Sequence, residues 1–116
     1  MTSLIAMLST GKGTWSQVIK LINIQEWDSI YLITNQFGKE NFKTDKKVNL
    51  IILNSRDIKE MRNQLLKELD EKLEGDVAVN FVSGAGDEHM ALVTALIKLG
   101  IGIRFIIPDK EGIEEL

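Results

Sequence analysis

Two short glycine-containing loops carry the residue types best suited to binding a phosphate group. The first, residues 9–14, reads Ser-Thr-Gly-Lys-Gly-Thr, and the second, residues 83–88, reads Ser-Gly-Ala-Gly-Asp-Glu. Each loop follows an apolar run typical of a strand and leads into a helical pattern. Glycine allows backbone N–H groups to approach a ligand closely, and the N-terminus of the following helix attracts anions. We therefore expect the two loops to form one crevice if their strands are neighbours in the sheet.

The candidate ligand contacts in this crevice are hydroxyl groups, backbone N–H groups, one amide and one lysine. The Lys12 ammonium can pair with a phosphate oxygen, and the hydroxyls of Ser9 and Ser83 can donate hydrogen bonds to phosphate or ribose. Asn35 ends the second expected strand and can contact the edge of a base. Each residue has an ordinary alternative, because loop lysines are commonly exposed and hydroxyls and amides commonly close turns. The complete set of predicted ligand-binding residues is Ser9, Thr10, Gly11, Lys12, Gly13, Asn35, Ser83, Gly84, Ala85 and Gly86.

Two residues have the chemistry to take part in a reaction at such a phosphate. Lys12 can stabilise developing negative charge, and His89, the single histidine of the chain, can move a proton. The alternative for His89 is a plain hydrogen-bonded or exposed residue in the first turn of a helix. Because the chain has no cysteine and one histidine, we expect no metal site, and no motif indicates a cofactor.

Three common phosphate-binding motifs do not fit the loops. The P-loop motif needs a glycine at the position of Ala6 and a serine or threonine at the position of Gly13, directly after the lysine. The dinucleotide fingerprint fails because Ser16 replaces its third glycine and the second strand ends near Asn35 without an acidic residue. A phosphoacceptor domain would carry an aspartate at the end of the third strand, where Asn54 stands. These absences disfavour nucleotide hydrolysis by a P-loop, NAD binding and phosphoacceptor chemistry.

The elements around the loops indicate a single α/β domain over residues 1–116. Apolar strand candidates alternate with amphipathic helix candidates, which is typical of a parallel sheet covered by helices. We predict a Rossmann-like three-layer fold with a mainly parallel five-stranded sheet in the order 3-2-1-4-5. The expected strands are residues 4–8, 29–34, 48–53, 77–82 and 101–107. The expected helices are residues 14–24, 57–75 and 87–99, with one or two turns between residues 35 and 47 anchored by Phe37 and Phe42.

Capping patterns set the expected helix ends. Thr14 and Asp57 each precede a Gln or Glu three residues later, as in a capping box, and Gly75 is expected to end the second long helix. Trp15 is expected to pack beneath the first helix, with base stacking as the alternative. The stripe of that second helix expected to face the sheet is Ile58, Met61, Leu65, Leu69 and Leu73.

The helix expected at residues 87–99 is apolar around nearly its whole circumference. Only a narrow polar strip is left near His89, Thr94 and Lys98. A helix of this kind is usually buried on two sides. We therefore expect a homodimer in which this helix is covered by a second subunit, the alternative being a monomer with a partly exposed helix.

The net charge and the hydropathy of the sequence indicate which partners the protein can bind and in which cellular compartment it is found. The formal net charge of -3 argues against binding to duplex nucleic acid, which depends on many Lys and Arg contacts to phosphate. No apolar run approaches the roughly 20 residues needed to span a membrane, and the first residues lack the basic region of a signal peptide. We expect a soluble, cytoplasmic protein with no membrane partner.

The fourth strand and its loop resemble a known family. Residues 80–86 read Asn-Phe-Val-Ser-Gly-Ala-Gly and are followed by Met90, Ala91 and Leu92, a pattern similar to the fourth-strand motif of CARF domains, the CRISPR-associated Rossmann-fold ligand sensors. The resemblance implies a stand-alone member that forms a two-fold homodimer and binds a small nucleotide, a cyclic oligoadenylate, across the dimer axis. Some members of that family, called ring nucleases, also cleave this ligand.

One departure from the family pattern concerns charge. Asp87 and Glu88 stand where many CARF domains carry a Thr-Lys pair, and two carboxylates facing a phosphate would repel it. Both acids also suit the start of a helix, and we expect Asp87 to be the N-cap residue.

Three functions therefore remain open. The first is a nucleotide-binding sensor, and the second is a metal-independent ring nuclease in which a ribose 2′-hydroxyl attacks the adjacent phosphate. The third is a protein-interaction subunit with no small-molecule ligand.

Overall fold

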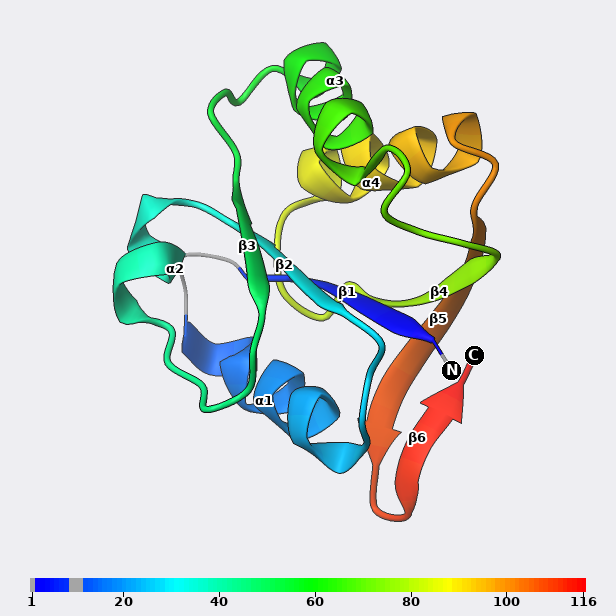
Figure 1. Ribbon diagram of the computed structural model, residues 1–116. Coiled ribbons are helices and arrows are strands. Elements are labelled where there is room, and N and C mark those ends of the chain that lie inside the picture. Colours follow the sequence, from blue (N-terminus) through cyan, green and yellow to red (C-terminus); the bar gives the residue numbers. More distant parts are fainter. Residues whose placement is uncertain (1, 9–11) are drawn as a thin grey trace.

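The computed structural model describes residues 2–8 and 12–116, with the side chain of Lys12 left out. Figure 1 shows a mostly parallel sheet with helices on both faces, so the predicted α/β Rossmann-like class is confirmed. The described strands are β1 (Ser3–Met7), β2 (Ile30–Thr34), β3 (Asn49–Ile52), β4 (Asp76–Asn80), β5 (Gly102–Asp109) and β6 (Gly112–Glu115). The described helices are η1 (Lys12–Thr14), α1 (Trp15–Ile24), α2 (Gln36–Asn41), α3 (Ile58–Leu69) and α4 (Gly86–Lys98).

The sheet has the strand order β3-β2-β1-β4-β5-β6, which contains the predicted order and adds a sixth strand. β6 pairs antiparallel with β5 through a turn in which Gly112 has a φ of 138°, a conformation that favours glycine. Arg104 on β5 forms an ion pair with Glu115 on β6, with 2.7 Å between Nη2 and Oε1. Ile113 packs against the core beneath α1. β6 was not predicted from the sequence because the strand has only four residues and two of them are acidic.

The two faces of β1 are both covered, which explains its continuous apolar sequence. Ile5 and Met7 point toward α3 and α4, whereas Leu4, Ala6 and Leu8 point toward α1 and α2. All five side chains are buried. β1 is therefore a rigid central support for the loop that follows it.

The helix after β3 begins as expected but ends earlier. The carboxylate of Asp57 accepts a hydrogen bond from the Glu60 N–H at 3.0 Å, which is one half of the expected capping box, whereas the Asp57 N–H donates to the Ser55 hydroxyl oxygen. α3 then ends at Leu69 and does not reach Gly75, because Asp70 leaves the helical conformation and Glu71 has a φ of 63°. Met61, Leu65, Leu69 and Leu73 are buried as predicted, but Ile58 is exposed.

The first helix lacks the predicted side-chain cap. Thr14 is the N-cap residue of α1 but its side chain makes no capping hydrogen bond, so the capping box expected there is wrong. Trp15 is buried, and its ring lies 5.9 Å from Phe37 and 5.6 Å from Phe42. The predicted packing of Trp15 is confirmed, and α2 is the expected short helical segment.

α4 packs against α3 as well as against the sheet. Its buried apolar residues are Ala91, Leu92, Ala95 and Leu96. Met90 and Ile97 remain 57% and 64% exposed, and Val93 between them is half-buried. The helix is therefore covered within the chain more fully than its composition suggested, and one narrow apolar stripe is left uncovered.

Candidate functional site

The crevice was predicted at the carboxyl edge of the parallel strands, next to β1 and β4. β1 pairs with both β2 and β4, with Ala6 opposite Leu32 on one side and Asn80 on the other. The carboxyl ends of β1 and β4 therefore lie side by side at the point where the strand order reverses. In open α/β sheets ligands bind in this position.

The first predicted loop falls largely outside the described part of the chain. Ser9, Thr10 and Gly11 are not among the described residues, and of Lys12 only the backbone is described, as the first residue of η1. Gly13 is exposed, and an added Cβ there would meet nothing within 4 Å. The ligand roles of these residues stay predictions.

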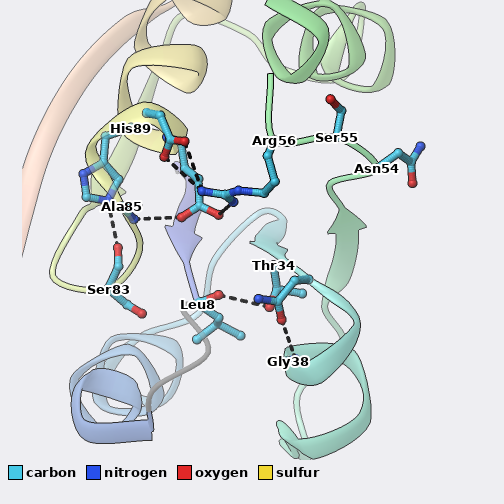
Figure 2. A network of polar contacts seen from close by, with 12 residues as sticks. Leu8, Thr34, Gly38, Asn54, Ser55, Arg56, Ser83, Ala85 and His89 are labelled. Atoms are coloured by element: carbon cyan, nitrogen blue, oxygen red, sulfur yellow. Dashed lines mark hydrogen bonds and ion pairs between the residues drawn. The ribbon is translucent and has the colours of Figure 1, made fainter. Parts of the chain in front are cut away.

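The second loop is held tightly against the end of β1. Gly84 has a φ of 100°, and a Cβ at this position would lie 2.9 Å from the Cβ of Met7 and 2.9 Å from Nε2 of His89. Ser83 is buried, and its carbonyl oxygen accepts a hydrogen bond from His89 Nε2 at 2.8 Å (Figure 2). Glycine is thus required at position 84 both for its conformation and for its closeness to β1.

His89 is built into the support of this loop. Its ring stacks on Phe81 with a centroid distance of 4.2 Å and an interplanar angle of 7°. Because a carbonyl oxygen only accepts, Nε2 must carry the proton in its bond to Ser83. These contacts match the ordinary structural alternative for His89, and its catalytic role stays a prediction.

Asn35 and Thr34 also make structural contacts at this edge. The Asn35 carboxamide oxygen accepts a hydrogen bond from the Gly38 N–H at 2.9 Å and caps α2, while the Thr34 hydroxyl donates to the Leu8 carbonyl at 3.1 Å (Figure 2). A Cβ at Gly38 would lie 1.8 Å from the Thr34 hydroxyl oxygen. Asn35 was expected to be a turn residue if it did not contact a ligand, and the structure shows it as a helix cap; its contact with a base stays a prediction.

The two acids at the start of α4, Asp87 and Glu88, accept hydrogen bonds from Arg56 and from nearby backbone N–H groups. One carboxylate oxygen of Glu88 accepts from the Ala85 N–H at 2.7 Å, and the other accepts from Arg56 Nη1 at 2.8 Å. Asp87 accepts from Arg56 Nη2 at 3.0 and 3.2 Å and from the Glu88 N–H at 2.8 Å. The expectation that Asp87 is the N-cap residue is wrong: α4 begins at Gly86 after Ala85, and the capping carboxylate belongs to Glu88.

Arg56 is a residue of this edge that the sequence analysis missed. It lies between β3 and α3 and, in Figure 2, extends from there toward Ala85 at the start of α4. Its side chain is 63% exposed although it contacts both acids. Hydrogen bonding and charge attraction to Glu88, followed by the charge of Asp87, raise the pKa of Arg56 above its ordinary value. The guanidinium is thus a permanent cation at the carboxyl edge of the sheet.

A usable signal for Arg56 was present in the sequence. Residues 54–57 form a polar segment directly after the third strand, so they had to emerge at the same sheet edge as the two glycine loops. A cation near two adjacent acids at that edge would be favoured by charge attraction. The pairing itself depends on how α3 and α4 pack and has no local sequence pattern.

Two hollows in the described part of the chain are lined by residues other than the predicted ones. A hollow of about 510 Å³ at the amino ends of β2 and β3 is lined by Trp27, Asp28, Lys46 and Lys47 among others. An apolar hollow of about 200 Å³ lies beside the carboxyl ends of β4 and β5, between Phe81, Phe105 and Leu116. Within the described residues, no group of three or more His, Cys, Asp or Glu side chains could hold a metal ion.

No protein-family model matches this chain, and no curated protein matches it either. In the part of the chain that the structure describes, no helix has the length and apolar character needed to cross a bilayer.

Proposed function

We propose that this protein is a CARF-type homodimer that binds a small nucleotide of the cyclic oligoadenylate class in the crevice after β1 and β4. The observation that carries the proposal is the bridge from Arg56 to Asp87 and Glu88. Two unpaired carboxylates beside the second loop would oppose an anionic ligand. The guanidinium offsets one of these two negative charges and offers N–H donors that a phosphate could accept from.

The shape of the second loop supports the same proposal. Gly84 brings the backbone within contact distance of β1, and Ser83 and His89 hold it there. A ligand at this edge would meet a preformed backbone and would not have to order this loop. Preorganisation of this kind reduces the entropic cost of binding.

The exposed stripe on α4 supports a dimer. Met90, Val93 and Ile97 lie three and four residues apart, so they share one side of the helix. α3 and the sheet already cover the opposite side. A second copy of the chain related by a two-fold axis would bury the two stripes against each other.

Binding is favoured over cleavage by the contacts of His89. Its Nε2 is bonded to a backbone carbonyl and its ring is stacked on Phe81, so it already has a structural task. A ring nuclease would need a proton-transfer group free to reach the ligand. The sensor is therefore the function we propose.

The test is calorimetric titration of the purified protein with cyclic tetraadenylate and cyclic hexaadenylate, with chromatography of the ligand afterwards. We expect heat of binding with at least one ligand and no new product. Absence of heat with both ligands would refute the nucleotide site. Formation of a linear product would make the protein a ring nuclease.

A further inference from the structure

We propose that Arg56 contacts a phosphate oxygen of the bound nucleotide, with Glu88 as its fixed positioning partner and Asp87 as the partner that the phosphate replaces. This inference rests on the proposed function and adds to it a specific residue and an exchange of partners. It assigns unequal roles to two acids that are neighbours in the sequence.

Glu88 has the properties of a fixed partner. Its side chain is 11% exposed, and its two carboxylate oxygens are used by different groups, the Ala85 N–H and Arg56 Nη1. Moving Glu88 away from Arg56 would also disturb the start of α4. A carboxylate held by two such bonds keeps the guanidinium in one place.

Asp87 has the properties of an exchangeable partner. Its side chain is 32% exposed, and its contacts with Arg56 both go to the single nitrogen Nη2. Phosphate and carboxylate present similar oxygen acceptors to a guanidinium, so a phosphate can take the place of Asp87 at Nη2. The displaced carboxylate would then lie beside the phosphate, and the two negative charges would repel each other.

Arg56 also keeps donor capacity for a ligand. A guanidinium has five N–H donors, and among the described residues only the two acids accept from this one. No described residue accepts from its Nε, and 63% of the side chain is exposed. The guanidinium can therefore bind a phosphate while Glu88 still holds Nη1.

A purely structural bridge is the competing explanation, and it predicts a different pattern. If Arg56 only ties the segment after β3 to α4, then loss of Arg56, Asp87 or Glu88 should act in the same direction. Under our proposal, removal of the Asp87 charge strengthens nucleotide binding, whereas loss of Arg56 or Glu88 weakens it. The sign of the Asp87 effect separates the two explanations.

The experiment measures affinity for cyclic tetraadenylate and cyclic hexaadenylate in five variants by calorimetry. We expect Arg56→Ala to weaken binding about tenfold or more and Arg56→Lys to weaken it less, because lysine keeps the charge but loses the fork of donors. Glu88→Gln should weaken binding, and Asp87→Asn should strengthen it several-fold. The matched control is Arg62→Ala, which removes a half-buried arginine of α3 that contacts the neighbouring Asn63, with the same change in net charge.

The outcomes distinguish this inference from the function on which it rests. If the unmodified protein binds neither ligand, the proposed function and the inference both fall. If the unmodified protein binds one of the two ligands, and Arg56→Ala has the same affinity for it as Arg62→Ala, only the inference is wrong. Weaker binding by Asp87→Asn would also overturn it. Circular dichroism melting of each variant separates a loss of binding from a loss of fold. The substitutions at Arg56, which is exposed, and at Asp87, which is half-buried, decide the question even if Glu88→Gln unfolds.

Discussion

Arg56 and Glu88 are 32 residues apart in the sequence and are joined by a hydrogen bond of 2.8 Å between Nη1 and Oε2. β3 and β4, the strands that precede them, are separated in the sheet by β2 and β1. The bond therefore ties together two segments of the carboxyl edge that the sheet itself does not join. Because Glu88 also accepts from the Ala85 N–H, the same side chain couples Arg56 to the second glycine loop.

Substitution of Glu88 by alanine should destabilise the protein. The change removes the carboxylate that caps the Ala85 N–H and leaves Arg56 with only Asp87, for an expected loss of about 1 to 2 kcal/mol in the free energy of unfolding. Urea denaturation measures this loss. Glu111→Ala is the control, since Glu111 is an exposed acid of the β5–β6 turn. Equal stability of the two variants would contradict a capping role for Glu88.

Substitution of Gly84 by alanine should destabilise the protein and weaken ligand binding together. The φ of 100° is costly for alanine, and the new Cβ would approach both Met7 and His89, so we expect a loss of about 1 to 3 kcal/mol. Thermal unfolding followed by calorimetry with cyclic tetraadenylate measures both effects. For the stability measurement, Gly86→Ala provides a matched control two residues away, because its Cβ would meet nothing within 4 Å and alanine favours helix. A Gly84→Ala variant as stable as Gly86→Ala would refute the tight approach of the loop to β1.

The arrangement of the sheet could be predicted because each central strand has a strong local signal. β1 and β4 are short apolar runs followed by glycine, and the alternation of such runs with helices restricts the order of parallel strands. β6 has no such signal, because pairing with β5 and the contacts of Arg104 and Ile113 stabilise a strand that is acidic in sequence. The end of α3 likewise depends on the backbone at Glu71 and not on the glycine at position 75.

The candidate site could be predicted only in part. Gly84 and Ser83 were identified from a contiguous pattern, whereas Arg56 belongs to another part of the chain and enters the site through the packing of α3 on α4. The start of α4 was misplaced for a related reason. Ala85 has no capping side chain of its own, and its N–H is satisfied by Glu88, three residues later, so the adjacent Asp87 resembled a cap that it is not.

A charged residue on the exposed stripe of α4 should dissociate the proposed dimer. Ile97 is 64% exposed in the single chain, and Ile97→Asp would place a charge at the centre of an apolar interface, where it would be desolvated without a partner. We expect sedimentation equilibrium to give the mass of two chains for the unmodified protein and of one chain for this variant. Ile19→Asp, on the exposed side of α1, should leave the mass of two chains unchanged. A mass of one chain for the unmodified protein at micromolar concentration would refute the dimer.

Lys12 provides the remaining test of the first loop. Within that loop its backbone is the first residue of η1, and the predicted contact of its ammonium with a phosphate oxygen is a single charge interaction. We expect Lys12→Ala to weaken binding of cyclic tetraadenylate by about tenfold at low salt, and by less as added salt screens the charge. Lys110→Ala, which removes an exposed lysine from the β5–β6 turn, should bind like the unmodified protein. If the two variants have the same affinity at every salt concentration, Lys12 does not contact the phosphate, and binding depends on the second loop and Arg56.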